Sequence, residues 1–109
     1  MARHLLGHPR NLLSKVMYEW RRAQVARAIL DYLRKHPEAQ DTLAGITEWW
    51  LPEQQIKTQT GTVKVAIAEL VARGLILQRK GRDSQIHYRV NRRRLKEIKA
   101  AFLKEPDRT

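Results

Sequence analysis

The stretch TVKVAIAELVARGLILQRKGRDSQIHYRV, residues 62–90, decides the fold. Apolar residues recur at helical spacing through its first part, which predicts a helix that ends just before Gly74. A glycine at this position is typical of a helix C-terminus, because it adopts the left-handed conformation at little cost. The apolar period then changes from about 3.6 residues to about 2, so residues 75–79 and 85–90 are predicted strands. The polar loop around Gly81 makes the two strands a β-hairpin.

Two helices are predicted before this stretch. Residues 21–35 carry one apolar stripe at helical spacing and are soon followed by a proline, which cannot continue a helix. Residues 40–51 form a shorter predicted helix, with Asp41 or Thr42 as the N-cap and Pro52 at the end. The polar connection to the next helix is longer than the about three or four residues usual in a helix-turn-helix.

Residues 1–20 carry another apolar stripe at helical spacing, out of phase with the stripe that follows. Gly7 and Pro9 are expected to interrupt a helix early in this segment. Two interpretations stay open: a separate helix packs back on the domain, which we favour, or its apolar side meets a second copy of the chain. We therefore divide the chain into this N-terminal extension, a domain over residues 21–91, and a basic C-terminal helix and tail over residues 92–109.

The predicted order of elements is helix, helix, helix, hairpin, helix. This order predicts a mostly helical α+β fold, the winged helix-turn-helix, in which a three-helix core carries a two-stranded wing. An additional helix is expected at each end of the chain. The apolar side chains expected to face the core are Val25, Ala28, Ile29, Tyr32, Leu33, Leu43, Ile46, Trp50, Val63, Ala66, Ile67, Leu70, Val71, Ile86, Tyr88, Val90, Leu95, Ile98 and Phe102.

Residues 62–76 also resemble the recognition helix and first wing strand of winged-helix transcriptional repressors, which commonly read Ser/Thr-Val-x-x-x-Leu-x-x-Leu-x-x-x-Gly-Leu-Ile. The wing is similar to that of repressors of the arsenical-resistance and multiple-antibiotic-resistance types. The resemblance covers residues 21–90 and implies a regulator that binds duplex DNA. The metal-sensing repressors use cysteines, and this chain contains none. The matching wing positions are Arg79, Gly81, Arg82, Ile86, Tyr88, Arg89 and Val90.

The charge of the chain favours the same partner. A net charge of +11 and a pI near 10.7 suit a polyanion, nucleic acid before an anionic membrane surface. Residues 36–56 hold no Lys or Arg and four acidic residues, whereas residues 57–99 hold twelve Lys or Arg and three acidic residues. The positive charge is therefore concentrated around the predicted recognition helix and wing, where double-stranded DNA is the expected partner.

In a winged helix the third helix enters the major groove and the wing contacts the backbone or the minor groove. The exposed positions of this third helix carry no Arg, Asn or Gln, the side chains that recognise guanine or adenine through two hydrogen bonds. We therefore predict that the protein holds phosphates well and reads bases poorly. The residues predicted to contact DNA are Lys57, Thr60, Thr62, Lys64, Arg79, Lys80, Arg82, Gln85, His87, Arg89, Arg92 and Arg93.

The adjacent residues Trp49 and Trp50 suggest a different function. Neighbours on a helix point about 100° apart, so we expect Trp50 to face the core and Trp49 to be exposed beside Glu48. Two interpretations stay open: both rings wrap the small core, which we favour, or Trp49 and Glu48 form an interaction patch. The second interpretation gives, as an alternative function, a winged-helix module that binds a protein partner through its acidic second helix. An RNA-binding module is a weaker alternative, because the platform of exposed aromatic side chains that such modules use is missing.

Other classes of function find no support in the sequence. It contains no cysteine and no arrangement of nucleophile and base or of paired carboxylates that suggests an enzyme. His4 and His8 are four residues apart but lack a third ligand, so neither a metal site nor a cofactor is expected. No apolar run reaches the about 20 residues needed to cross a bilayer. We expect a cytoplasmic protein that forms homodimers through its N- and C-terminal helices.

Overall fold

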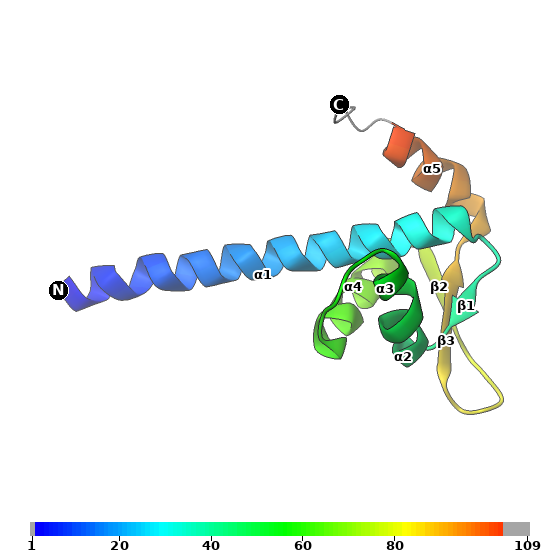
Figure 1. Cartoon of the computed structure of the whole chain (residues 1–109), viewed down its shortest axis with the longest axis horizontal. Coiled ribbons are helices and arrows are strands. Elements are labelled where there is room, and N and C mark those ends of the chain that lie inside the picture. Colours follow the sequence, from blue (N-terminus) through cyan, green and yellow to red (C-terminus); the bar gives the residue numbers. More distant parts are fainter. Residues whose placement is uncertain (1, 104–109) are drawn as a thin grey trace.

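The computed structural model describes the backbone of residues 2–103 and the side chains of residues 13–103. Helix α1 (Ala2–Lys35) lies along the longest dimension of the molecule, 55 Å. At about 1.5 Å per residue the helix is long enough to span nearly all of it. Figure 1 shows the other elements gathered around the C-terminal half of α1, while the N-terminal half projects beyond them.

Helix α1 is continuous where the sequence predicted an interruption at Gly7 and Pro9 and a separate helix over residues 21–35. Both predictions were wrong. A proline costs the helix one backbone hydrogen bond, and the run behind it propagates the helix, because residues 10–35 contain neither glycine nor proline. Residues 13–20 are all exposed, so the N-terminal apolar stripe does not pack back on the domain, contrary to the interpretation we favoured.

The second helical segment follows a short strand, β1 (Gln40–Asp41). It consists of α2 (Leu43–Gly45), a π-helical turn η1 (Ile46–Trp50) and α3 (Leu51–Glu53), which follow one another directly. The predicted helix over residues 40–51 is therefore shifted toward the C-terminus, and its first two residues are extended.

The ends of this segment were predicted in part. Thr42 is the N-cap, and its hydroxyl accepts a hydrogen bond from the Gly45 N–H over 3.2 Å. Pro52 does not end the segment as expected, because it lies in the first turn of α3, a position at which proline is well tolerated.

The π turn separates the two tryptophans. Trp50 is 2% exposed, and its ring stacks on Tyr32 with the ring centroids 4.8 Å apart. Leu51 is also buried, because the wider turn brings two consecutive residues toward the core. Trp49 is 68% exposed. The predicted division into one buried and one exposed tryptophan is confirmed, and the favoured interpretation that both rings wrap the core is wrong.

Helix α4 (Thr60–Ala72) and the hairpin of β2 (Ile76–Lys80) and β3 (Ile86–Val90) follow the prediction closely. Gly74 has a φ of +77°, and the next N–H donates to the helix carbonyl five residues earlier over 3.0 Å. The helix therefore ends in the left-handed cap that the sequence predicted.

The sheet has three antiparallel strands in the order β1-β3-β2, where two were expected. Strand β1 pairs Gln40 with Arg89 and Asp41 with Tyr88. The additional strand satisfies backbone groups on the open edge of β3. The mostly helical α+β class and the winged helix-turn-helix topology are confirmed.

The chain then turns through η2 (Arg92–Arg94), a short 3-10 helix, into α5 (Leu95–Leu103), which packs on α1. The Phe102 ring faces α1, and the guanidinium groups of Arg27 and Arg34 lie 4.3 and 5.1 Å from its centroid. The tail over residues 104–109 lies outside the described residues. The largest fully buried side chains are Val25, Ile29, Leu33, Ile46, Leu51, Val63, Ile67, Leu70, Ile76 and Val90.

Candidate nucleic-acid interface

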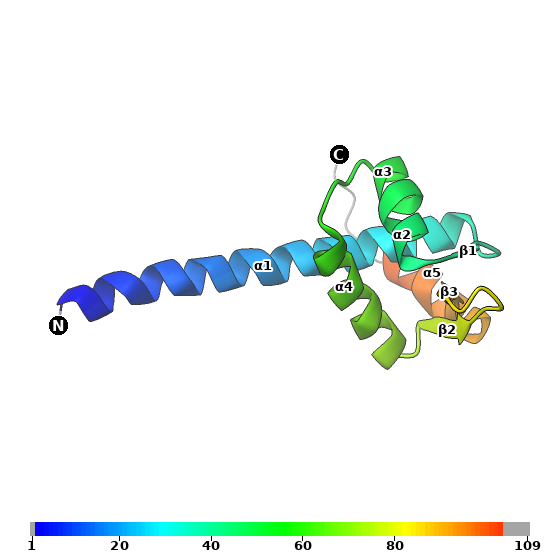
Figure 2. The ribbon, with the colours of Figure 1, turned by 90° about the horizontal axis from the view of Figure 1, so that it is seen from below.

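Helix α4 and the hairpin lie next to one another on the side of the molecule that Figure 2 shows. The side chains of α4 are divided between core and solvent as the helical period requires. Those that pack in the core are Val63, Ala66, Ile67 and Leu70. Those that face solvent on the other side are Thr60, Gly61, Lys64, Val65 and Ala68.

The start of α4 is positioned by a left-handed residue at the end of α3. Gln55 has a φ of +62°, and its N–H donates to the Pro52 carbonyl over 2.8 Å. This cap turns the chain away from α3, and the short connection that follows carries Lys57 in an exposed position.

The predicted contacts at the start of α4 do not all face the same way. Thr60 and Lys64 are exposed, whereas Thr62 is half-buried at the edge of a hollow of about 650 Å³ between α4 and α1. The residues that line this hollow are Met17, Tyr18, Trp20, Arg21, Lys57, Thr58, Gln59 and Thr62.

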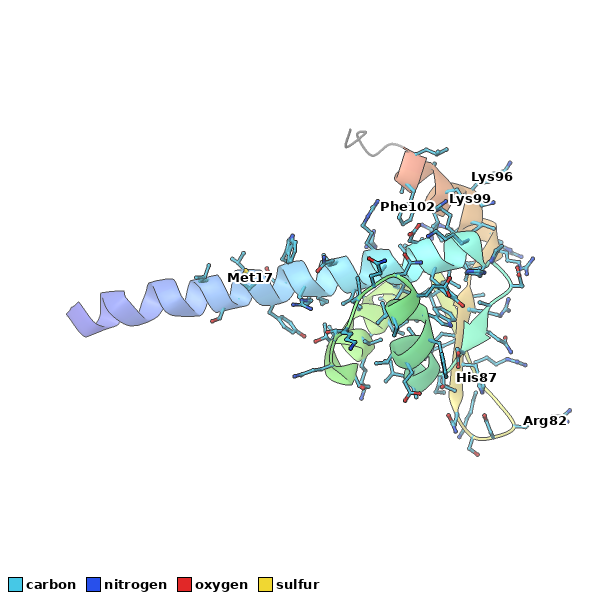
Figure 3. The ribbon with its side chains drawn as sticks, viewed as in Figure 1. Met17, Arg82, His87, Lys96, Lys99 and Phe102 are labelled. Atoms are coloured by element: carbon cyan, nitrogen blue, oxygen red, sulfur yellow. The ribbon has the colours of Figure 1, made fainter. Side chains whose placement is uncertain are left out.

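The turn of the wing is organised by Asp83. Its carboxylate accepts the Gln85 N–H over 3.0 Å and lies 3.1 Å from Nε2 of His87. The backbone hydrogen bond from Gln85, and then that of the His87 ring, hold the pKa of Asp83 below its usual value. A Cβ at Gly81 would lie 2.8 Å from the Asp83 carboxylate and 2.9 Å from the His87 ring, so any larger residue there would displace these two side chains. His87 therefore supports the turn, while Arg82 extends from the tip (Figure 3).

The alternation of side chains along the strands separates the wing cations into two groups. Lys80 is on the face of the sheet that Ile76 and Val90 turn toward the core, and Arg82 is in the turn. Arg79 and Arg89 lie on the opposite, solvent face. Together with Arg92 of η2 they border a hollow of about 400 Å³; its other lining residues are Pro37, Glu38, Gln40 and Val90.

Several basic side chains on the helices form ion pairs with acidic residues, whereas, among the described residues, the Lys and Arg side chains of the wing do not. The Arg34 Nε donates to Asp31 over 2.9 Å, and the Arg94 Nε donates to Glu97 over 2.6 Å. Within residues 13–103, however, many basic side chains near α4 and the wing have no acidic partner within 4 Å. They are Lys57, Lys64, Arg79, Lys80, Arg82, Arg89, Arg92 and Arg93.

One residue that positions the wing was missed from the sequence. The Asn91 side-chain amide donates to the Gly74 carbonyl over 2.8 Å, and its backbone N–H donates to the Leu75 carbonyl over 2.9 Å. Its side-chain oxygen accepts the Arg93 N–H over 3.2 Å and caps η2. Asn91 thus joins the end of β3 to the end of α4. An asparagine directly before a helix is a cap signal that could have identified part of this role.

The second predicted surface is separate from the wing cations. Trp49 and Glu48 are both exposed on η1, next to one another in the sequence. In the part of the chain whose side chains are described, no group of three or more His, Cys, Asp or Glu could hold a metal ion. The side chains of His4 and His8 lie outside that part. No helix among the described residues is both long and apolar enough to cross a membrane.

The comparisons with known proteins concern the fold. No family model matches the chain, and no curated protein matches it. Among solved structures, a PadR-family transcriptional regulator from Eggerthella lenta DSM 2243 matches with a TM-score of 0.53. The match covers 88% of this chain and 87% of that chain at 20% sequence identity. At this identity the similarity concerns the fold, and the function has to be argued from the surface.

Proposed function

We propose that this protein is a transcriptional regulator that binds double-stranded DNA through α4 and the wing. The observation that carries the proposal is the set of unpaired cations around these two elements, on a fold whose third helix enters the major groove in DNA-binding proteins. Unpaired Lys and Arg side chains are the groups that neutralise phosphates and release counterions. The PadR-family regulator of similar fold supports this class of function.

The structure favours some of the predicted contacts over others. Lys57 and Lys64 border the exposed side of α4, while Lys80 and Arg82 lie toward the end of the wing. A straight duplex on α4 would meet these four first, together with Thr60 and Gln85. The cations on the solvent face of the sheet, Arg79, Arg89 and Arg92, and the adjacent Arg93 would be reached only by a duplex that bends around the wing.

A duplex-binding titration across a salt series tests the proposal. If about four cations meet phosphates, the logarithm of the binding constant falls with that of the salt concentration with a slope of about −3 to −4. Arg82→Glu should reduce the affinity strongly, while Arg89→Glu, with the same change of charge on the other face of the sheet, should reduce it less. Absence of binding to any duplex at low salt would refute the proposal.

The projecting half of α1 supports a homodimer. Leu13, Val16, Met17 and Trp20 are exposed there at helical spacing, Trp20 to 59%. An isolated helical arm of this kind is marginal in water unless its apolar side is packed, and a second copy of the chain offers the same side. Sedimentation should give a dimer, and Val16→Lys should give a folded monomer. A wild-type monomer at concentrations of tens of micromolar would exclude this arrangement.

Trp49 supports a second candidate function, a protein-binding surface on η1. A tryptophan with 68% exposure beside an acidic residue is costly to leave in water and is typical of contact surfaces. If the candidate is right, Trp49→Ala abolishes capture of a partner and leaves duplex binding unchanged. Loss of both in that variant would contradict it.

The proposal also includes a division of the chain at residues 20 and 91, a cytoplasmic location and no catalytic activity. It further includes a closer likeness to repressors of the arsenical-resistance and multiple-antibiotic-resistance types. The same titration tests the RNA-binding alternative. If the protein is an RNA-binding module, a structured RNA of equal length should bind more tightly than the DNA duplex.

A further inference from the structure

The solvent side of α4 is apolar at its centre. Val65 is 39% exposed and points directly away from the buried side of the helix. One turn before it lies Gly61 and one turn after it lies Ala68, both exposed. The centre of the predicted recognition surface therefore carries methyl groups and backbone in place of hydrogen-bonding groups.

The wing also carries an exposed apolar side chain, separate from this surface. Ile86, expected in the core, is 38% exposed on β3. It borders a hollow of about 470 Å³ that lies mainly between the wing and the segment of α2 and η1, and Thr60 is the one residue of α4 in its lining.

The packing of the protein does not require this surface to be so small and apolar. A Cβ added at Gly61 would meet no atom within 4 Å, and glycine in the first turns of a helix lowers its stability relative to alanine. Glycine on an exposed helix face is typical of a site that a ligand approaches closely.

The polar groups at the border of this surface are not placed to read bases through paired hydrogen bonds. The one acidic residue of α4, Glu69, is held by Arg22 of α1 at 3.4 Å. Lys64 lies at the side of the exposed strip, where it can meet a phosphate. The feature of the major groove that an apolar helix face can contact is the 5-methyl group of thymine.

We propose that α4 selects A·T-rich duplexes by packing Val65 and Ala68 against thymine methyl groups. The inference rests on the proposed function and adds the class of sequence that the helix prefers. Lys57 before α4 and Lys64 on its exposed side place positive charge beside this surface, which suits phosphates and favours DNA as the occupant.

The test compares two duplexes that differ only in methyl groups. One is a short A·T-only duplex with thymine, and the other has uracil at every thymine position. Wild-type protein should bind the uracil duplex more weakly, by about fourfold for each methyl group that the helix buries. In a G·C-only duplex, 5-methylcytosine should strengthen binding relative to cytosine, because it places a methyl group at the same edge of the groove.

Two matched variants assign the effect to α4. Val65→Ala removes methyl groups from the centre of the surface and should lower the thymine-to-uracil ratio, leaving only the share that Ala68 contributes. Leu77→Ala shortens a side chain of nearly equal exposure, 37%, on the solvent face of the sheet, and should leave the ratio unchanged. Circular dichroism checks that both variants are folded.

The outcomes separate the inference from the proposed function. Equal affinity of the wild type for the thymine and uracil duplexes overturns thymine selection and leaves DNA binding in place. A thymine preference that is as large in Val65→Ala as in the wild type overturns the role assigned to Val65 on α4. Failure to bind every duplex overturns both.

Discussion

The helical body and the wing are held by different forces, although they belong to the same domain. In the body, α1, α4 and α5 pack apolar side chains against one another, and the largest of these are fully buried. The wing buries Ile76 and Val90 at its base, where hydrogen bonds of Asn91 join it to α4, and its turn depends on hydrogen bonds at Asp83. The body can therefore be damaged by removing carbon atoms, and the wing by removing single donors or acceptors.

The largest expected effect is on the body. Ile67→Ala removes a 1% exposed side chain of α4 and should lower the free energy of unfolding by about 2–5 kcal/mol. Urea unfolding followed by circular dichroism measures the change. Val65→Ala, on the exposed side of the same helix, is the control and should change the stability by less than about 0.5 kcal/mol. Similar effects of the two variants would contradict the packing described for α4.

A smaller effect is expected at the junction between body and wing. Asn91→Ala leaves the Gly74 carbonyl without its side-chain donor and should cost about 1–2 kcal/mol of unfolding free energy. Asn91→Asp keeps the acceptor for the Arg93 N–H but cannot donate to Gly74, so it separates the two bonds. Hydrogen exchange should show faster exchange in β3 than in α4 for the alanine variant. Equal acceleration in both elements would mean that Asn91 supports the whole domain.

In the connection before α4, a substitution is expected to raise the free energy of unfolding. Gln55 adopts a left-handed conformation that glycine accepts at lower cost, so Gln55→Gly should raise the stability by about 0.5 kcal/mol. Gln54→Gly is the matched control, because Gln54 has a φ of −88° and glycine there gains nothing. Thermal unfolding of the two variants checks the prediction, and a loss of stability in both would show that the cap at Gln55 is not strained.

The smallest effect is confined to the wing turn. The folded-state pKa of Asp83 lies below its usual value of 3.8, so the carboxylate stabilises the turn fully above that value. The contribution is lost as the pH falls through the lower folded-state pKa. The NMR signal of the Gln85 amide should shift in this acidic range, and Asp83→Asn should remove the transition. A transition in the asparagine variant would assign it to another group.

The sequence was informative wherever structure follows from local periodicity. The apolar spacing from Val63 to Leu70, the stop at Gly74 and the alternation in β3 predicted a helix and a hairpin that the structure confirms. Strand β1 could not be found in this way, because two residues have no period and pair only after β3 lies beside them. The sequence did not predict the continuity of α1, because Pro9 is a residue that usually interrupts a helix, while the helix-forming run behind it outweighs this effect.

For the candidate site, too, the sequence predicted what depends on local pattern and composition, and missed what depends on three-dimensional contacts. Composition placed the cations near α4 and the wing, but it could not show that Arg79 and Arg89 share one face of the sheet while Lys80 lies on the other. Nor could it show that His87 turns to Asp83, since that contact depends on the shape of the hairpin. The contacts with DNA remain predictions that the proposed variants test.

The unbroken course of α1 has a mechanical consequence. The projecting arm and the segment packed against α4 belong to one uninterrupted helix (Figure 1), so the direction of the arm is fixed relative to the domain. A partner that binds the arm therefore also determines the orientation of the whole domain. In a dimer formed through the two arms, the length and direction of α1 would determine the distance and the angle between the two wings.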